Sequence, residues 1–313
     1  MLILAPMQGL TELLFRKVYH DTFPGALDSA VSPFLSLTHG NLETAWKKIE
    51  DVLPQLNVDS IPVVPQILGR EPEEFVALAN RLHEVGYDEV NWNIGCPMRR
   101  VAGKHRGSGI LPYPDEVKFV LDNVVPHLHL KLSVKMRLGY YNREEIFNLI
   151  PILNDYPLKS VTIHPRIGKQ VYSGQVDLDT FEKVLPNLHH HVVYNGDIHS
   201  ISDYRKIRKR FPQITDFMLG RGILRNPSLP YQIRDWESGK NERDYTQQVR
   251  QLMLNLIQAI DNRPVSSEAK VRKTKEYWCL MGDAFGITEM QKKSVLHRPN
   301  FEETRFAILD IIQ

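Results

Sequence analysis

The sequence predicts an α/β protein, a (β/α)8 TIM barrel followed by a small all-helical C-terminal domain. Eight short apolar runs alternate with longer, more charged segments, and a polar residue, glycine or proline follows nearly every run directly. The alternation stops after about Tyr231, where only helical spacing of apolar residues continues. Repeated strands and helices indicate a parallel sheet with crossover helices, and eight repeats favour closure into a barrel over an open sheet.

The eight apolar runs have the length and composition of buried parallel strands. Each spans four to six residues and is rich in aliphatic side chains, which is typical of strands covered on both faces. The predicted strands are Leu2–Ala5, Leu27–Ser32, Pro62–Ile67, Asp88–Trp92, Leu132–Met136, Lys159–Ile163, His191–Tyr194 and Asp216–Leu219.

Helical segments lie between these runs. Pro72–Val85 and Pro114–Val125 carry apolar residues three and four positions apart, and each begins with a proline, which suits the first helical position. Three more helical patterns follow the barrel, after a polar linker around Trp236–Asp244. We therefore predict a catalytic barrel over residues 1–240 and a helical domain over 241–313, with helices at Gln247–Ile260, Glu268–Met281 and Phe301–Ile312.

The composition is that of an ordinary globular protein. Hydrophobic residues make up 42% and charged residues 24%, which argues against a disordered or fibrous chain. No apolar run reaches the roughly eighteen residues of a membrane span, and the first residues lack the basic and apolar regions of a signal peptide. A cytoplasmic protein is expected. The net charge of +2 does not by itself indicate nucleic-acid binding.

The two cysteines, Cys96 and Cys279, form no C-x-x-C pair, so we expect neither a disulfide framework nor a metal site. Cys96 follows a predicted strand directly, between Gly95 and Pro97. These neighbours favour a sharp corner at the end of the strand. A thiol there could be a nucleophile, a metal ligand, a proton donor or a small buried hydrophobic residue.

Donor side chains follow two later strands. Lys135 lies near the end of the fifth predicted strand, while His164 and Arg166 follow the sixth. The carboxyl ends of barrel strands meet at one mouth, where barrel enzymes have their active sites. Lys135 is therefore either paired with a nearby carboxylate or held against a cofactor or substrate that becomes negative during reaction.

Glycine-bearing loops follow the seventh and eighth strands. Asn195-Gly196-Asp197 and Gly220-Arg221-Gly222 occupy the two positions that barrels commonly use to bind phosphate. Glycine lets backbone N–H groups approach an anion, and an arginine can donate two hydrogen bonds to it. The pair of loops predicts a phosphate-bearing ligand.

A basic segment lies in the predicted helical domain. Between Lys270 and Arg298 there are seven basic residues and three acidic ones, and Arg272 and Lys275 belong to this segment. The excess is either a solvated helix face or a set of phosphate contacts for a nucleic acid.

Taken together, these motifs resemble the tRNA-dihydrouridine synthases, flavoenzymes that reduce a uridine of tRNA. The resemblance covers the barrel and extends more weakly into the helical domain, and the chain departs from it at Ser32 and Pro165. Six segments carry it in order: Ala5–Thr11 with Phe15 and Arg16, Asn93–Pro97 with Val101, Val134–Arg137, His164–Arg166 with Gln170–Gly174, Asn195–Ile198, and Gly220–Gly222.

The resemblance implies an FMN in the barrel mouth and NADPH as the reductant. Pro6, Met7 and Gln66 would lie near the isoalloxazine ring, with Lys135 and His164 on its polar edge. The ribityl chain and phosphate would be held by Asn195, Gly196, Asp197, Gly220 and Arg221.

The resemblance also implies a role for the thiol. Hydride passes from N5 of the flavin to C6 of a uracil in the tRNA D-loop, and Cys96 donates a proton to C5. Asn93 and Arg166 would bind the uracil. Because the base must leave the tRNA stack to be reached, the helical domain would hold the tRNA body through Lys270, Arg272 and Lys275.

Two other functions are weighed against this one. An FMN barrel acting on free pyrimidines, like dihydroorotate dehydrogenase, would keep the phosphate loops and Lys135 but would not need a basic helical domain. A non-catalytic RNA-binding relative would not need Cys96, Lys135 and His164 together. No protein partner and no membrane association are implied, and a monomer is expected.

Overall fold

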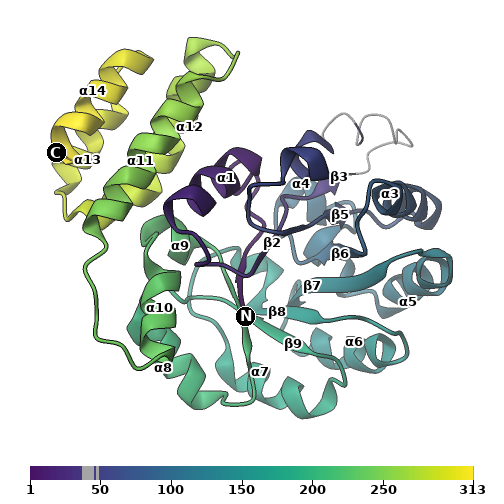
Figure 1. The fold of residues 1–313 in the computed structure, drawn as a ribbon. Coiled ribbons are helices and arrows are strands. Elements are labelled where there is room, and N and C mark those ends of the chain that lie inside the picture. The colour runs from purple at the N-terminus through teal and green to yellow at the C-terminus, as the bar shows by residue number, and fades with distance from the viewer. Residues whose placement is uncertain (37–45, 47–48, 313) are drawn as a thin grey trace.

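The computed structural model describes residues 1–36, 46 and 49–312 of the chain. Figure 1 shows a ring of strands surrounded by helices, with a separate group of helices at the C-terminus. Every strand pairing in the described part of the chain is parallel. The predicted fold class, a parallel (β/α)8 barrel followed by helices, is confirmed.

The barrel closes through a strand that proline interrupts. β1 (Leu2–Leu4) pairs with both β10 (Asp216–Leu219) and β2 (Ser29–Val31), and β2 pairs with β4 (Val63–Val64). Pro65 separates β4 from β5 (Gln66–Leu68), which pairs with β3 (Leu35–Ser36) and with the next strand of the ring. Proline has no N–H to donate, so the two short segments are one strand of the barrel with a break in its ladder.

The remaining strands fall where the apolar runs predict them, but they end later than predicted, two of them by three residues or more. β7 continues three residues beyond Met136, and β8 continues four beyond Ile163. Arg137 and Arg166 therefore lie within strands, not in the loops that follow them. The bounds are β6 Glu89–Ile94, β7 Lys131–Gly139, β8 Val161–Ile167 and β9 Val192–Asn195.

Helices cover the outside of the ring (Figure 1). α3 (Pro72–Glu84) and α5 (Pro114–Val124) begin at the predicted prolines and bury their apolar stripes. The predicted linker begins two residues too early, since α10 (Leu229–Glu237) includes Trp236 and packs Ile233 into the core. The other helices here are α1 Leu13–Thr22, α4 Arg99–Ala102, α6 Glu145–Asn154, α7 Leu178–Val184, α8 Ile201–Arg210 and α9 Arg221–Arg225.

The C-terminal helices are α11 (Thr246–Asp261), α12 (Ser267–Met281), α13 (Glu289–Leu296) and α14 (Phe301–Ile312). Three match the predicted helical patterns, while α13 has only one buried residue and so lacks an apolar stripe that could predict it. α11 packs on α1, and α12 packs on α9. The Tyr277 hydroxyl on α12 donates to the carbonyl oxygen of Leu10, 2.8 Å away. The domain boundary at residue 240 stays a prediction.

No helix in the described ranges is long and apolar enough to cross a membrane.

Candidate active site

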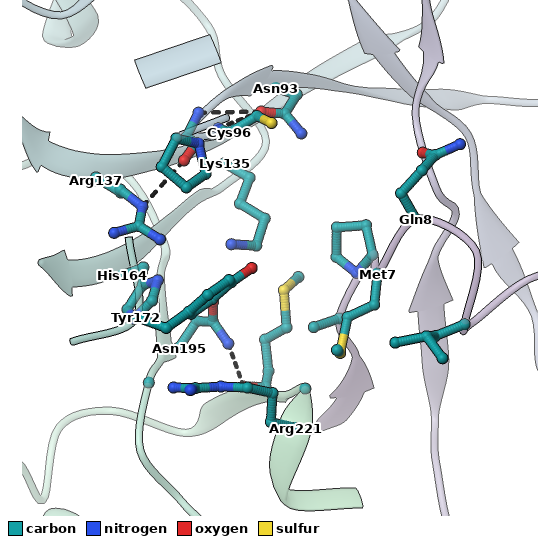
Figure 2. A pocket seen from close by; sticks show the side chains of 18 of the residues that line it. Met7, Gln8, Asn93, Cys96, Lys135, Arg137, His164, Tyr172, Asn195 and Arg221 are labelled. Carbon is teal, nitrogen blue, oxygen red and sulfur yellow. Dashed lines mark hydrogen bonds between the residues drawn. The ribbon is translucent and has the colours of Figure 1, made fainter. Parts of the chain in front are cut away.

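A cavity of about 430 Å³ opens at the carboxyl ends of the strands, within the range of about 300–1,000 Å³ typical of small-molecule sites. It lies where the sequence places the mouth of the barrel. Figure 2 shows side chains from several strand ends converging on it. The predicted site residues that line it are Pro6, Met7, Asn93, Cys96, Lys135, His164, Asn195, Gly196, Asp197, Gly220 and Arg221.

Cys96 lies at a corner that hydrogen bonds hold in place. The side-chain oxygen of Asn93 accepts from the backbone N–H of Gly95 at 3.1 Å and from that of Cys96 at 2.9 Å. The Cys96 carbonyl accepts from the backbone N–H and the hydroxyl of Ser108, each at 3.0 Å. The thiol is thus fixed at the cavity wall (Figure 2).

The thiol is held in its protonated form. Burial raises the pKa of Cys96 above its ordinary value. A backbone hydrogen bond from Met98 and the positive charges of Arg137 and Lys135 oppose this shift without cancelling it. A protonated thiol is a proton donor at neutral pH and a poor nucleophile. Of the four roles open to Cys96, this environment favours proton donation.

Lys135 points its ammonium group into the middle of the cavity (Figure 2). Among the residues that the structure describes, no carboxylate pairs with it and no group accepts a hydrogen bond from it, so the alternative of a structural ion pair finds no support. Burial, together with the charge of Arg137, lowers the pKa of Lys135 to about 7. Such a cation is suited to an anionic or strongly accepting ligand.

His164 is neutral, and its neighbour fixes its tautomer. Burial, together with the charges of Arg137 and Lys135, lowers the pKa of His164 well below its usual range. A guanidinium nitrogen of Arg166 lies 3.1 Å from Nε2. Because a guanidinium only donates, Nε2 accepts and Nδ1 carries the proton. His164 can therefore donate a hydrogen bond from Nδ1.

Arg166 does not line the cavity. Its two terminal nitrogens donate to the carboxylate of Asp197 at 2.8 and 2.6 Å, and it also donates to the carbonyl oxygens of Ser173 and Gly174. Burial alone would raise the pKa of Asp197, but a hydrogen bond from His199 and the pairing with Arg166 lower it well below its usual range. The predicted contact of Arg166 with a uracil stays a prediction, and its donors are used inside the protein.

The two glycine loops meet at one side of the cavity. Gly196 has a φ of +147°, which a residue with a side chain rarely adopts. A Cβ atom on Gly222 would lie 2.0 Å from the Ile198 carbonyl oxygen, so only glycine lets the two loops approach this closely. Asp197 also accepts from Arg221 at 3.3 Å. The structure thus brings together all five residues predicted to hold a ribityl chain and a phosphate.

Gln66 lies beneath the cavity, not in its wall. The side chain is fully buried, and its amide oxygen accepts from Asn93 at 2.7 Å. Its amide nitrogen donates to Asn91, also at 2.7 Å. Direct contact between Gln66 and a flavin stays a prediction, while its contact with Asn93 is a feature of the structure.

Arg137 and Tyr172 line the cavity, although the sequence predicted no binding role for them. Arg137 lies two positions after Lys135 on the same strand, and residues two apart share a face. That alternation could have identified it had the strand been taken past Met136. Its guanidinium donates to the carbonyl oxygens of Gly95 (3.1 Å), Ile167 and Val171. The guanidinium carbons of Arg137 and Arg221 lie 5.6 and 4.5 Å from the centre of the Tyr172 ring.

Residues 3–304 match the family model described as dihydrouridine synthase. The chain belongs to the dihydrouridine synthase family. A tRNA-dihydrouridine(16) synthase of Neisseria meningitidis serogroup B is 30% identical over 250 residues, which cover 78% of this chain and 74% of that protein. A tRNA-dihydrouridine synthase B of Escherichia coli is 31% identical over 202 residues, 63% of this chain and 60% of that protein.

Solved structures of other families share the fold of this dihydrouridine synthase. The old yellow enzyme homologue from Zymomonas mobilis aligns with a TM-score of 0.52 at 11% identity, covering 79% of this chain and 91% of that one. A morphinone reductase aligns with a TM-score of 0.50 at 11% identity, covering 79% and 89%. At this identity the likeness concerns the barrel alone.

The three cations predicted to bind RNA lie on α12, outside the cavity, and differ in their surroundings. Lys270 Nζ donates a hydrogen bond to Asp261 Oδ1 at 3.1 Å. Lys275 donates to the Arg298 carbonyl oxygen at 2.6 Å. Arg272 is exposed, and within the described residues it has no hydrogen-bonding partner. Arg272 and Lys275 line a second, shallow groove on the outer side of α12.

Proposed function

We propose that this dihydrouridine synthase uses FMN and NADPH to reduce the C5–C6 double bond of a uridine in the tRNA D-loop. The observation that carries the proposal is that a protonated thiol, Cys96, and a cation without a carboxylate partner among the described residues, Lys135, line the same cavity at the barrel mouth. A proton donor and a site for developing negative charge are the two groups that reduction of an activated double bond requires.

The cavity has the donor set that an FMN needs. The two glycine loops and Arg221 would hold its phosphate and ribityl chain, as they join an arginine to backbone N–H groups. Lys135 and His164 Nδ1 are donors for the polar edge of an isoalloxazine ring. Pro6 and Met7 are apolar residues of the same cavity, and Figure 2 shows Met7 across the cavity from Lys135. When bound there and reduced by NADPH, FMN supplies a hydride for C6 of the uracil.

The residues of the chain would supply the remaining requirements. Cys96 keeps its proton until it transfers it to C5, because burial favours the neutral thiol. Asn93 fixes the Cys96 backbone and reaches the same cavity, so it can orient the uracil beside the thiol. Arg137 lies in the same wall and can donate to a carbonyl oxygen of the base.

A tRNA substrate would explain the exposed cations on the outer face of α12. A uridine must leave the stack to enter a cavity in a barrel mouth, so the rest of the tRNA has to be held beside it. Arg272 and Lys275 are cations on the groove of α12, which packs on α9 next to the cavity residue Arg221. They would contact phosphates. The chain would act as a monomer in the cytoplasm.

The proposal is tested by purifying the protein, identifying its bound flavin by mass spectrometry, and supplying NADPH with a tRNA transcript. We expect FMN, and dihydrouridine in the D-loop of the digested tRNA. Uracil and dihydroorotate are supplied in parallel, because turnover of either with none on tRNA would favour a free-pyrimidine enzyme. Protein that binds no flavin after reconstitution with FMN would overturn the proposal.

A further inference from the structure

One layer of the barrel interior, directly beneath the cavity, is polar. Gln66 on β5, Asn91 on β6 and Ser133 on β7 are register partners on three neighbouring strands. All three side chains are buried, and none lines the cavity. Barrel interiors are usually filled by branched apolar residues, and a buried amide is costly unless its hydrogen bonds are made. A polar layer at this place therefore indicates a role beyond filling space.

Hydrogen bonds join this layer into a chain that ends at the cavity wall. Asn93 Nδ2 donates to Gln66 Oε1 at 2.7 Å. Gln66 Nε2 donates to Asn91 Oδ1, also at 2.7 Å. Asn91 Nδ2 donates to Ser133 Oγ at 3.0 Å. Each link joins one donor to one acceptor, so the four side chains form a single directed network.

The loop that carries the thiol fixes the direction of this network. The backbone N–H groups of Gly95 and Cys96 can only donate, so the Asn93 atom that they contact must be the amide oxygen. The NH2 group of Asn93 must then face Gln66, which has to present its oxygen. The same constraint passes to the next amide. Turning any amide around would place two donors or two acceptors against each other.

We propose that Asn91 and Ser133 are positioning residues, which act on Cys96 through Gln66 and Asn93. They hold the Gln66 amide in the one orientation that lets Asn93 keep its oxygen on the Cys96 backbone. The inference deepens the proposed function and rests on it, since a proton donor must be held within reach of one carbon atom. The inference goes beyond the proposed function because it assigns a role to residues that touch neither the cavity nor the thiol.

The test changes Asn91, which bonds to both Gln66 and Ser133. Because Asn91 lies outside the cavity, all residues of the cavity wall are kept. Asn91→Leu has nearly the same size but leaves the Gln66 NH2 group without an acceptor. Asn91→Asp is the matched control, because a protonated carboxyl offers a C=O and an O–H where asparagine has its C=O and NH2. Both variants are compared with wild type by thermal unfolding, so that labelling is measured on folded protein.

The first readout is the reactivity of the thiol, which requires neither tRNA nor turnover. Iodoacetamide labels Cys96, and the exposed Cys279 is the internal reference in the same molecule. We expect the ratio of Cys96 to Cys279 labelling to rise roughly fivefold or more in Asn91→Leu and less than about twofold in Asn91→Asp, as local opening of the loop governs access. Should Asn91→Leu fail to fold, Ser133→Ala replaces it and shifts the ratio in the same direction by a smaller factor.

The second readout separates chemistry from binding. Asn91→Leu should form dihydrouridine about tenfold more slowly with an unchanged KM for tRNA, because the thiol and Asn93 are misplaced while the surfaces that hold the tRNA body are intact. Flavin content and the rate of flavin reduction by NADPH should equal those of wild type. An unchanged labelling ratio in folded Asn91→Leu and Ser133→Ala overturns the inference. Absence of product from wild-type protein would instead contradict the proposed function, and the labelling ratio would still decide the positioning role.

Discussion

The barrel mouth and the outer face of α12 are both rich in cations, but they hold them differently. In the mouth, Lys135 lines the cavity without an acceptor among the described residues, and Arg137 bonds only to backbone carbonyl oxygens. On α12, Lys270 is paired with Asp261. The mouth therefore leaves two cations, Lys135 and Arg137, without a carboxylate partner among the described residues, whereas α12 pairs Lys270 with a carboxylate and leaves the exposed Arg272 without one.

The surroundings of a cation therefore indicate its role better than the number of cations nearby does. A surface ion pair such as that of Lys270 contributes little to stability or to recognition. An uncompensated cation away from bulk water, such as Lys135, destabilises the protein unless a ligand uses it. By this criterion Lys135 is a binding residue, Arg272 is the best phosphate contact on α12, and Lys270 is a structural residue.

The largest effect should come from the mouth. Cys96→Ala should lower dihydrouridine formation by roughly 10²–10⁴-fold, the usual range for a positioned proton donor. FMN content and tRNA affinity should be unchanged, because the Asn93 contact is to the backbone of residue 96. The measurement is product per tRNA by mass spectrometry with a tRNA-binding assay in parallel. Equal product formation in the variant and wild type would remove the thiol from the reaction.

The next effect concerns the uncompensated cation. Lys135→Met should weaken FMN binding about 10–100-fold, the loss expected for a charge-assisted hydrogen bond. Fluorescence titration of the cofactor-free protein measures it, with Lys270→Met as the control of equal chemistry. If both variants bind FMN as tightly as wild type, the unpaired Lys135 is no more a cofactor-binding residue than the paired Lys270.

The same cation should destabilise the protein when no cofactor is bound. The folded pKa of Lys135, about 7, lies below the usual value of 10.5, so the unfolded chain binds more protons between these two pH values. Stability therefore rises with pH across this interval. Cofactor-free Lys135→Met should resist urea better than wild type, most at pH 6 and progressively less toward pH 10. A constant difference across that range would contradict the lowered pKa.

A smaller effect is expected on α12, where Arg272 and Lys270 should differ in their contribution to tRNA binding. Arg272→Ala should reduce the salt dependence of tRNA binding by about one phosphate contact. Lys270→Ala should leave that slope unchanged and cost at most about 1 kcal/mol of stability, since its pair with Asp261 is only partly buried. Binding titrations at several salt concentrations give the slopes. Equal slopes for the two variants would show that pairing does not decide which cation contacts RNA.

The fold was predictable because its signals are local. Each apolar run and each proline-led helix is visible within a short stretch of chain, and the strand ends predicted a common mouth. α13 was not predictable in this way, because it buries only Val295 and so carries no periodic stripe.

The site was only partly predictable, because some of its contacts join residues that are distant in sequence. His164 and Arg166 share a strand face, but Asp197, which captures the arginine, lies 31 residues further on. Nothing in the local sequence pattern shows that Arg166 binds Asp197 while Arg137 lines the cavity. Likewise, the buried position of Gln66 depends on hydrogen bonds to Asn91 and Asn93, two residues of the neighbouring strand β6 that only the barrel register brings beside it.

We expect Cys96 to deliver a proton to one face of C5, and deuterium from the solvent can be followed to that position. The reaction is run in heavy water with NADPH, where the thiol exchanges its proton for deuterium before it acts. Dihydrouridine should carry solvent deuterium on a single face of C5. Deuterium spread over both faces of C5 would contradict a positioned thiol donor.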